Sequence, residues 1–211
     1  MYNPPMQKNI LFMIFFCLTV IFTGNSFARE YVVNKIIDGD TIRLDTGETV
    51  RYLGIDAPEV YVKGKGAEFY ARDAARYNRK LVLMKKVRLE YDIEKKDQYG
   101  RLLAYVFVKN TFVNAELVKL GYAKVMIKPP NLKHKDLLLN NQKKAMAEER
   151  GLWQEKKKET EKIYTGNKRT YILHRPSCPE ADKISKKNRI IFRSRFDAIK
   201  VGYSPCRKCK P

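Results

Sequence analysis

Three carboxylates and two arginines in the first half of the chain have the residue types and spacing that phosphate chemistry requires. Asp40, Asp56 and Glu59 fall within one short stretch. Carboxylates held close together repel one another unless a cation neutralises them, and oxygen ligands favour Ca²⁺ or Mg²⁺ over zinc. Arg51 and Arg101 each carry a planar guanidinium that binds two phosphate oxygens at once. Taken singly, these residues also fit surface ion pairs, but the pattern indicates phosphodiester cleavage assisted by cations.

A β-hairpin must bring these side chains together. A turn over residues 45–48 places Asp40 opposite about Gly54, so that Asp40 and Asp56 emerge at the same open end of the hairpin. Strict alternation along the second strand would put Arg51 and Asp56 on opposite faces. We therefore expect a bend near Gly54.

The remaining sequence up to residue 153 predicts further strands and helices around this hairpin. Apolar periodicity predicts helices at 67–81, 114–120 and 136–150, and strands at 87–91 and 102–108. Strands that do not alternate regularly with helices, in a chain of this size, indicate a β-barrel with appended helices.

Four motifs occur in an order and spacing that resemble the staphylococcal nuclease (thermonuclease) family. They are IDGDT at 37–41, VRYLGIDAPE at 50–59, DQYGRLLAY at 97–105 and VNAELV at 113–118. The resemblance covers about residues 31–153. It implies an α+β, mainly β fold, a five-stranded OB-fold barrel with about three helices. It also implies a Ca²⁺-dependent nuclease that acts on DNA and/or RNA and leaves 3′-phosphates.

The resemblance also implies roles for individual residues. Asp40, Asp56 and the backbone carbonyl of Ala57 would hold Ca²⁺, Glu59 would activate water as general base, Arg51 and Arg101 would hold the phosphate, and Tyr99 would contact the substrate. The family's Tyr-x-Tyr segment, which lies over the bound nucleotide, should fall near residues 125–129, where no tyrosine stands. Gln98 replaces the family's lysine. These departures concern base stacking and affinity rather than the charge chemistry.

A second candidate metal site lies near the C-terminus. His174, Cys178, Cys206 and Cys209 supply four ligands with zinc-like spacing. The alternative is a Cys206–Cys209 disulfide with Cys178 free, which export would permit. Residues 171–211 resemble the small zinc-binding module of Ada-type DNA repair proteins. A histidine takes the place of one of that module's four cysteines, so we expect a structural zinc rather than alkyl transfer. So short a segment buries little core, and a metal would stabilise it.

The charge of the chain indicates a polyanionic partner. The 211 residues include 43 Lys+Arg against 23 Asp+Glu, a formal net charge of +20, and 44% hydrophobic residues, which excludes an acidic or a fully disordered protein. Nucleic acid or an anionic membrane would suit this charge. The candidate phosphate contacts in the C-terminal segment are Lys186, Lys187, Arg189, Arg193 and Arg195. The alternative is that these cations only form a solvated surface.

The N-terminus predicts a secretory signal peptide. Residues 1–28 carry Lys8 as their single charged side chain, followed by the apolar run Ile10–Phe22 and the small-residue ending Ser26-Phe27-Ala28. The run is shorter than the about 20 residues that a membrane span needs. We expect cleavage before Arg29 and a secreted or periplasmic protein without a membrane span. The alternative is an uncleaved anchor.

These observations predict four parts: a signal peptide at 1–28, an OB-fold nuclease domain at 29–153, a charged linker at 154–163 and a small zinc-binding domain at 164–211. The predicted function is that of an exported, monomeric, Ca²⁺-dependent nuclease. The alternatives are a non-catalytic OB-fold nucleic-acid-binding protein and a cationic protein that binds anionic lipid. The set of acids favours the nuclease, because acids beside a phosphate site would only repel the ligand of a pure binder.

Overall fold

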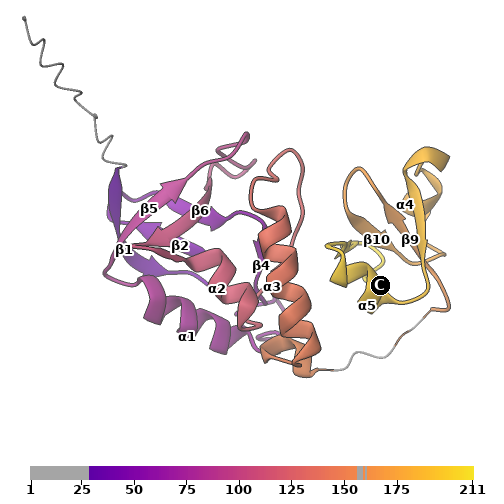
Figure 1. Cartoon of the computed structure of the whole chain (residues 1–211), viewed down its shortest axis with the longest axis horizontal. Helices are drawn as coiled ribbons and strands as arrows, with labels where there is room; N and C mark the ends of the chain where they lie inside the picture. Colours follow the sequence, from indigo (N-terminus) through magenta and orange to yellow (C-terminus); the bar gives the residue numbers. More distant parts are fainter. Residues whose placement is uncertain (1–28, 156–158, 160) are drawn as a thin grey trace, which may run out of the picture.

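The computed structural model describes residues 29–155, 159 and 161–211. The predicted signal peptide at 1–28 therefore lies outside the described residues, as do four residues of the predicted linker (156–158 and 160). Within the described part, none of the helices combines the length and the apolar character that crossing a bilayer requires. Figure 1 shows a barrel with three helices, followed by a smaller sheet with two short helices.

Five strands close into a barrel, which confirms the expected mainly β architecture. β1 (Glu30–Ile36), β2 (Thr41–Leu44), β3 (Thr49–Tyr52), β5 (Lys86–Glu90) and β6 (Leu102–Val108) follow the spatial order β3-β2-β1-β5-β6. Neighbours in this order are antiparallel, and a parallel pairing of β3 with β6 closes the ring. The two-residue strand β7 (Thr111–Phe112) extends β6.

The barrel interior is filled by aliphatic side chains that alternate along the strands. Full burial of each valine or isoleucine contributes about 1.5–3 kcal/mol relative to its exposure. Interior residues with no exposed surface are Val33, Ile42, Val50, Val87, Ala104 and Val106. The barrel is therefore a packed core, and the polar chemistry is confined to its ends.

The register of the β2–β3 hairpin differs by two residues from the expected one. Thr41 pairs with Arg51, and the Asp40 carbonyl accepts a hydrogen bond from the N–H of Tyr52, not from a residue near Gly54. The reason is a tight loop over residues 45–47, in which Gly47 has φ 88°. A shift of two residues preserves which face each side chain occupies, so the expected convergence of side chains survives the error.

Three helices cover one side of the barrel (Figure 1). α1 (Ala71–Val82) begins four residues later than predicted, because Tyr70 has φ 66°, which is incompatible with a helix interior. α2 (Val113–Lys119) ends before Gly121, as expected, and α3 (Lys135–Ala147) is followed by the 3₁₀ turn η1 (Gly151–Gln154). α3 contacts α2 on one side and the C-terminal part on the other.

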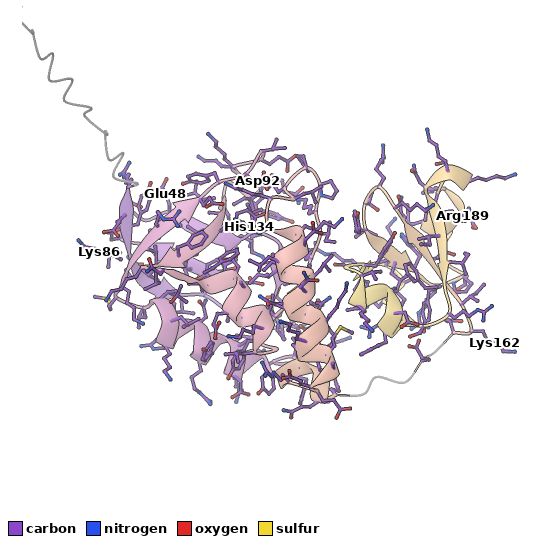
Figure 2. The ribbon with its side chains drawn as sticks, viewed as in Figure 1. Glu48, Lys86, Asp92, His134, Lys162 and Arg189 are labelled. Atoms are coloured by element: carbon purple, nitrogen blue, oxygen red, sulfur yellow. The ribbon has the colours of Figure 1, made fainter. Side chains whose placement is uncertain are left out.

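The start of α3 is tied to the barrel through His134 (Figure 2). Nε2 of His134 lies 2.7 Å from Oε1 of Glu90 on β5, and the imidazole meets the Tyr105 ring edge-on with 4.5 Å between centroids. His134 is thus half-buried and fixes the start of α3 against β5 and β6.

The C-terminal part has its own sheet and a small core. β11 (Arg189–Phe192), β9 (Tyr164–Asn167), β10 (Ile172–His174) and β12 (Ser204–Pro205) lie in that order. The helical pieces are α4 (Pro179–Asp182), η2 (Lys186–Asn188) and α5 (Arg195–Lys200). The hydroxyl of Ser194 accepts a hydrogen bond from the N–H of Asp197 at 3.2 Å and so caps the N-terminus of α5. The core consists of Tyr164, Leu173, Ala198 and Tyr203.

Candidate active site

Asp40 directly precedes β2 and follows Gly39, whose backbone packs closely against the side chains of Ala57 and Ala74. A Cβ added to Gly39 would lie 2.6 Å from Cβ of Ala57 and 2.9 Å from Cβ of Ala74, so this turn requires glycine. The N–H of Ala57 donates to Oδ2 of Asp40 at 2.5 Å, and the Thr41 hydroxyl donates to Oδ1 at 3.0 Å. The carboxylate of Asp40 is therefore held against Ala57 and is almost fully buried.

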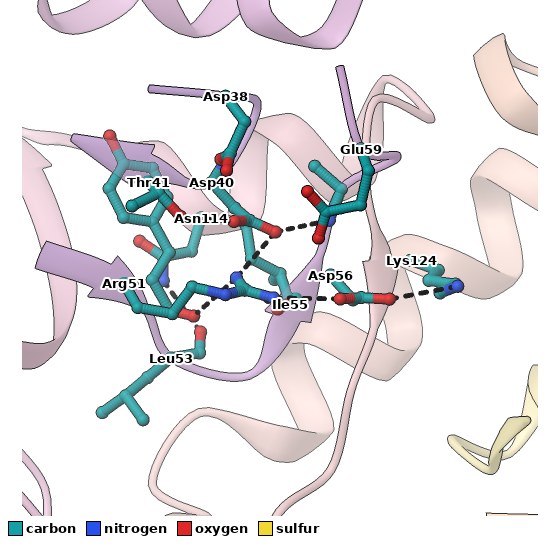
Figure 3. A network of polar contacts seen from close by, with 12 residues as sticks. Asp38, Asp40, Thr41, Arg51, Leu53, Ile55, Asp56, Glu59, Asn114 and Lys124 are labelled. Atoms are coloured by element: carbon teal, nitrogen blue, oxygen red, sulfur yellow. Dashed lines mark hydrogen bonds and ion pairs between the residues drawn. The ribbon is translucent and has the colours of Figure 1, made fainter. Parts of the chain in front are cut away.

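The guanidinium of Arg51 lies between two carboxylates (Figure 3). Its NH1 group lies 2.6 Å from Oδ2 of Asp40, and its NH2 group lies 2.9 Å from Oδ1 of Asp56. NH1 also donates to the carbonyl of Ile55 at 3.1 Å. This fork of donors holds the two acids on opposite sides of one cation.

The predicted bend at Gly54 is confirmed, and it is what turns Asp56 toward Arg51. Gly54 has φ 75° between β3 and the two-residue strand β4 (Ile55–Asp56). β4 leaves the barrel sheet and pairs with β8 (Lys124–Val125). This pairing brings Nζ of Lys124 to 3.1 Å from Oδ2 of Asp56. Spacing along the sequence gives no signal for Lys124, because its partner lies on a strand far away in the chain.

Two buried asparagines hold the loops that carry the acids, and the sequence analysis missed both. Nδ2 of Asn114 donates to the carbonyl of Leu53 at 2.8 Å, just before the bend. Nδ2 of Asn78 donates to the carbonyl of Asp38 at 3.1 Å, and its Oδ1 accepts from the Tyr52 hydroxyl. Both amides satisfy backbone groups that a loop would otherwise leave buried and unpaired.

Glu59 lies at the exposed rim of the same group and points toward Asp40 (Figure 3). Partial burial raises the pKa of Glu59, and the negative charges of Asp38 and Asp56 add to the rise, while Arg51 opposes it. A carboxyl group with a raised pKa accepts a proton more readily near neutral pH. Glu59 is thus an exposed carboxyl group beside the buried Asp40 and the half-buried Asp56.

Asp38, Asp40, Asp56 and Glu59, here called the acid cluster, carry more negative charge than their neighbours neutralise. Burial raises the pKa of Asp40 well above its ordinary value against the effect of Arg51, and the charges of Asp38 and Asp56 add to it. For Asp56, burial acts to raise the pKa, but Lys124, Arg51 and, more weakly, Arg207 bring it below the ordinary value. Hard oxygen donors in excess of nearby cations are the donor set that a divalent cation such as Ca²⁺ fits.

Arg101 and Tyr99 lie next to this arrangement but are not bonded to it. Arg101 immediately precedes β6, which pairs with β3 so that Leu103 faces Arg51. Nε of Arg101 donates to Oδ2 of Asp97 at 2.7 Å. Tyr99 is exposed, with its ring centroid 5.5 Å from the Arg101 guanidinium carbon. The fold therefore brings together Asp40, Arg51, Asp56, Ala57 and Glu59. The side chain of Arg101, just before the neighbouring strand β6, instead pairs with Asp97.

The four predicted ligands of the C-terminal site converge. His174 ends β10, Cys178 precedes α4, and Cys206 and Cys209 follow β12; one ligand atom from each lies within 4.8 Å of all the others. The three cysteines are free thiols rather than a disulfide pair with one left over. Burial lowers the pKa of His174, which keeps the imidazole in the neutral form that binds metal. This His/Cys₃ set fits a tetrahedral zinc site.

Comparison with known proteins matches both parts of the chain. The family described as "Staphylococcal nuclease homologue" matches residues 49–155, and "Metal binding domain of Ada" matches residues 150–211. The chain is 39% identical over 129 residues to the thermonuclease of Staphylococcus intermedius, covering 60% of this chain and 77% of that protein. The thermonuclease of Staphylococcus hyicus is 34% identical over 133 residues, covering 62% and 79%. Endonuclease YncB of Bacillus subtilis is 36% identical over 126 residues, covering 57% and 60%.

Proposed function

Because the chain belongs to the staphylococcal nuclease family and is a nuclease that hydrolyses phosphodiester bonds, we propose that it is an exported, Ca²⁺-dependent enzyme that leaves 3′-phosphate ends on DNA and/or RNA. The family match also supports nucleic acid as the substrate. A zinc ion in the C-terminal part is supported by the converging ligands together with the match to the Ada metal-binding domain.

The observation that carries the proposal is the position of Arg51 between Asp40 and Asp56. The acid cluster holds more carboxylates than the neighbouring cations neutralise, and its donors are oxygens. Asp40, Asp56 and the carbonyl of Ala57 would hold Ca²⁺. When bound, Ca²⁺ would supply positive charge against the negative charge that the phosphate gains in the transition state.

The residues of this chain divide the chemistry between them. Glu59 takes a proton from water as the water oxygen forms its bond to phosphorus, and the bond from phosphorus to the 5′ oxygen breaks. The 5′ oxygen takes up a proton from solvent water as it leaves, and the phosphate remains on the 3′ side. Arg51 and Arg101 donate their N–H groups to the non-bridging phosphate oxygens, whose charge grows during this step.

One experiment tests cation dependence and product chemistry together. Mature protein starting at Arg29 is incubated with end-labelled single- and double-stranded DNA and RNA, with Ca²⁺ or with EGTA. We expect cleavage in Ca²⁺ alone, and product 3′ ends that a polymerase extends only after phosphatase treatment. Full activity in EGTA would contradict the calcium dependence, and directly extendable 3′ ends would contradict the product assignment.

The organisation of the chain is part of the proposal. We place a signal peptide at 1–28, a nuclease domain at 29–153, a linker at 154–163 and a zinc module at 164–211 in a monomeric protein that is secreted or periplasmic. N-terminal sequencing of the exported protein should begin at Arg29. A product that retains residues 1–28 in the membrane fraction would instead favour the uncleaved anchor.

A further inference from the structure

A buried glutamine joins the barrel unit to helix α5 of the C-terminal part. Gln142 on α3 has no exposed surface. Its Oε1 accepts a hydrogen bond from the N–H of Val125 on β8 at 2.7 Å, and its Nε2 donates to the carbonyl of Ile199 on α5 at 2.7 Å. Because the oxygen and the nitrogen of this buried amide are both hydrogen-bonded, Gln142 fixes the position of α5 relative to β8.

Apolar packing seals the same contact. Gly202 is buried so closely against Ile127 and Leu139 that a Cβ at this position would overlap the Ile127 side chain. Tyr171 packs against both the barrel core and the C-terminal core, and its hydroxyl accepts a hydrogen bond from Nζ of Lys135 at 3.1 Å. The C-terminal part is therefore docked on α3 and the segment after β8, in addition to being connected through the linker.

This docking surface adjoins the acid cluster. Val125 follows Lys124, whose ammonium pairs with Asp56. From α5 the chain passes Gly202 and β12 and reaches the turn between Cys206 and Cys209. Figure 3 shows the yellow ribbon of the C-terminal part on the same side of the site as Lys124. The charge of Arg207, which lies in that turn, reaches Asp56, where it contributes to the lowered pKa of this carboxyl group.

The turn between the two cysteines holds two exposed cations with different surroundings. Nζ of Lys208 lies 2.6 Å from Oε1 of Glu180, so its charge is paired. Arg207 is exposed, and among the residues that the structure describes it has neither a hydrogen bond nor an ion pair. Arg207 is therefore an exposed cation of the docked C-terminal part, and its guanidinium is available to an incoming anion.

Two arginines that the sequence suggested as phosphate contacts are engaged within the C-terminal part instead. The guanidinium of Arg189, on the outer side of the C-terminal part in Figure 2, donates to the carbonyls of Ala181, Asp182 and Ile184. Nε of Arg195 donates to the carbonyl of Pro211. These bonds hold turns and the chain end, so neither of these two guanidinium groups is as available to an anion as that of Arg207.

We propose that Arg207 binds a backbone phosphate of the strand being cleaved, at a position outside the scissile phosphate, so that the zinc module forms one wall of the substrate groove. The proposal rests on the nuclease function of the barrel. Zinc would fix the turn that carries Arg207, and docking through Gln142 would fix that turn relative to Asp56. Arg207 is thus a substrate-positioning residue that takes no part in the bond-breaking step.

The test compares Arg207→Gln with Lys208→Gln, which removes the same charge from the next residue of the same turn. Each variant is assayed as full mature chain, after its zinc content is shown to equal that of wild type. One substrate is a single-stranded DNA oligonucleotide. The other is a nitrophenyl ester of a nucleotide, which offers one phosphodiester and no neighbouring phosphate. Arg207→Lys, which retains the charge, serves as the conservative variant.

We expect Arg207→Gln to raise KM for the oligonucleotide about three- to tenfold with little change in kcat, and to reduce the slope of log KM against log salt by about 0.7, since one phosphate contact is lost. The nitrophenyl ester should be cleaved at the wild-type rate. Lys208→Gln should match wild type on both substrates. Arg207→Lys, which keeps the charge, should have a KM for the oligonucleotide close to the wild-type value.

Equal kinetics of Arg207→Gln and Lys208→Gln on the oligonucleotide would overturn the proposal. An equal loss on both substrates would also overturn it, because that result would indicate disturbance of the catalytic site. Failure of the wild-type protein to cleave either substrate would instead remove the nuclease function on which the proposal rests.

Discussion

Arg51 makes the contacts on which the geometry of the site depends most. It bonds to both Asp40 and Asp56 through separate nitrogens of one planar group, and it lies almost wholly inside the protein. The attraction of Asp40 and Asp56 raises the pKa of Arg51 although burial acts to lower it, so the guanidinium stays charged. The same fork that separates the acids has the shape needed to bind two phosphate oxygens.

Replacing Arg51 by lysine should be damaging even though the charge is kept. An ammonium group is a single point donor and cannot span two carboxylates or two phosphate oxygens. We expect kcat/KM for DNA cleavage to fall by about 10²–10³. Arg43→Lys, at an exposed position of the same hairpin, should leave the rate unchanged. Wild-type kinetics of the Arg51→Lys variant would argue against a bidentate role.

Glu59→Gln tests the proposed base. The amide has nearly the same shape but cannot accept a proton, so turnover should fall by about 10²–10⁴ while binding of DNA, measured by fluorescence anisotropy, persists. Glu48→Gln provides the matched control, since it removes one exposed carboxylate from the neighbouring hairpin turn. Unchanged turnover in Glu59→Gln would exclude this residue as the base.

At the scale of elements, two turns position the acids: the one at Gly39 and the bend at Gly54. The bend could be predicted from sequence, because strand alternation and the need to unite Arg51 with Asp56 conflict without it. The start of α1 was predicted wrongly, since periodicity does not reveal that Tyr70 leaves the helical region. The contacts of Lys124 and Gln142 were missed because they depend on which elements pack together, which no local pattern encodes.

Gly39→Ala should disturb the site through sterics. The new methyl group would overlap the side chains of Ala57 and Ala74, so the loop that carries Asp40 must move. We expect a loss of about 1–3 kcal/mol in the free energy of unfolding, measured in urea, together with reduced cleavage. Thr46→Ala in the exposed hairpin turn is the control. Wild-type stability and activity in Gly39→Ala would show that this close approach does not position Asp40.

At the scale of the whole molecule, a barrel with a large core is joined to a small part whose core rests on few side chains. The barrel packs many fully buried aliphatic residues, whereas the C-terminal core is formed chiefly by Tyr164, Leu173, Ala198 and Tyr203. So small a core contributes little to the free energy of folding. A metal ion bound by the four converging ligands would add to that free energy.

Metal analysis should find one zinc ion per chain, and Cys178→Ser should lose it. Removal of zinc should expose the amide protons of residues 164–211 to hydrogen exchange while the barrel strands stay protected, because the barrel core does not depend on the metal. Retention of zinc in Cys178→Ser, or equal loss of protection in both parts, would contradict this division of stability.

The central claim is that the acid cluster binds a divalent cation and that this binding enables cleavage. The most direct measurement is a Ca²⁺ titration of the mature protein and of Asp40→Asn. Calorimetry measures Ca²⁺ binding, and cleavage of end-labelled DNA by the same samples measures activity. We predict that activity of the wild-type protein rises with occupancy of one Ca²⁺ site, and that Asp40→Asn loses both binding and cleavage in this range. Cleavage at full rate before any Ca²⁺ is bound, or undiminished Ca²⁺ binding by Asp40→Asn, would contradict the account.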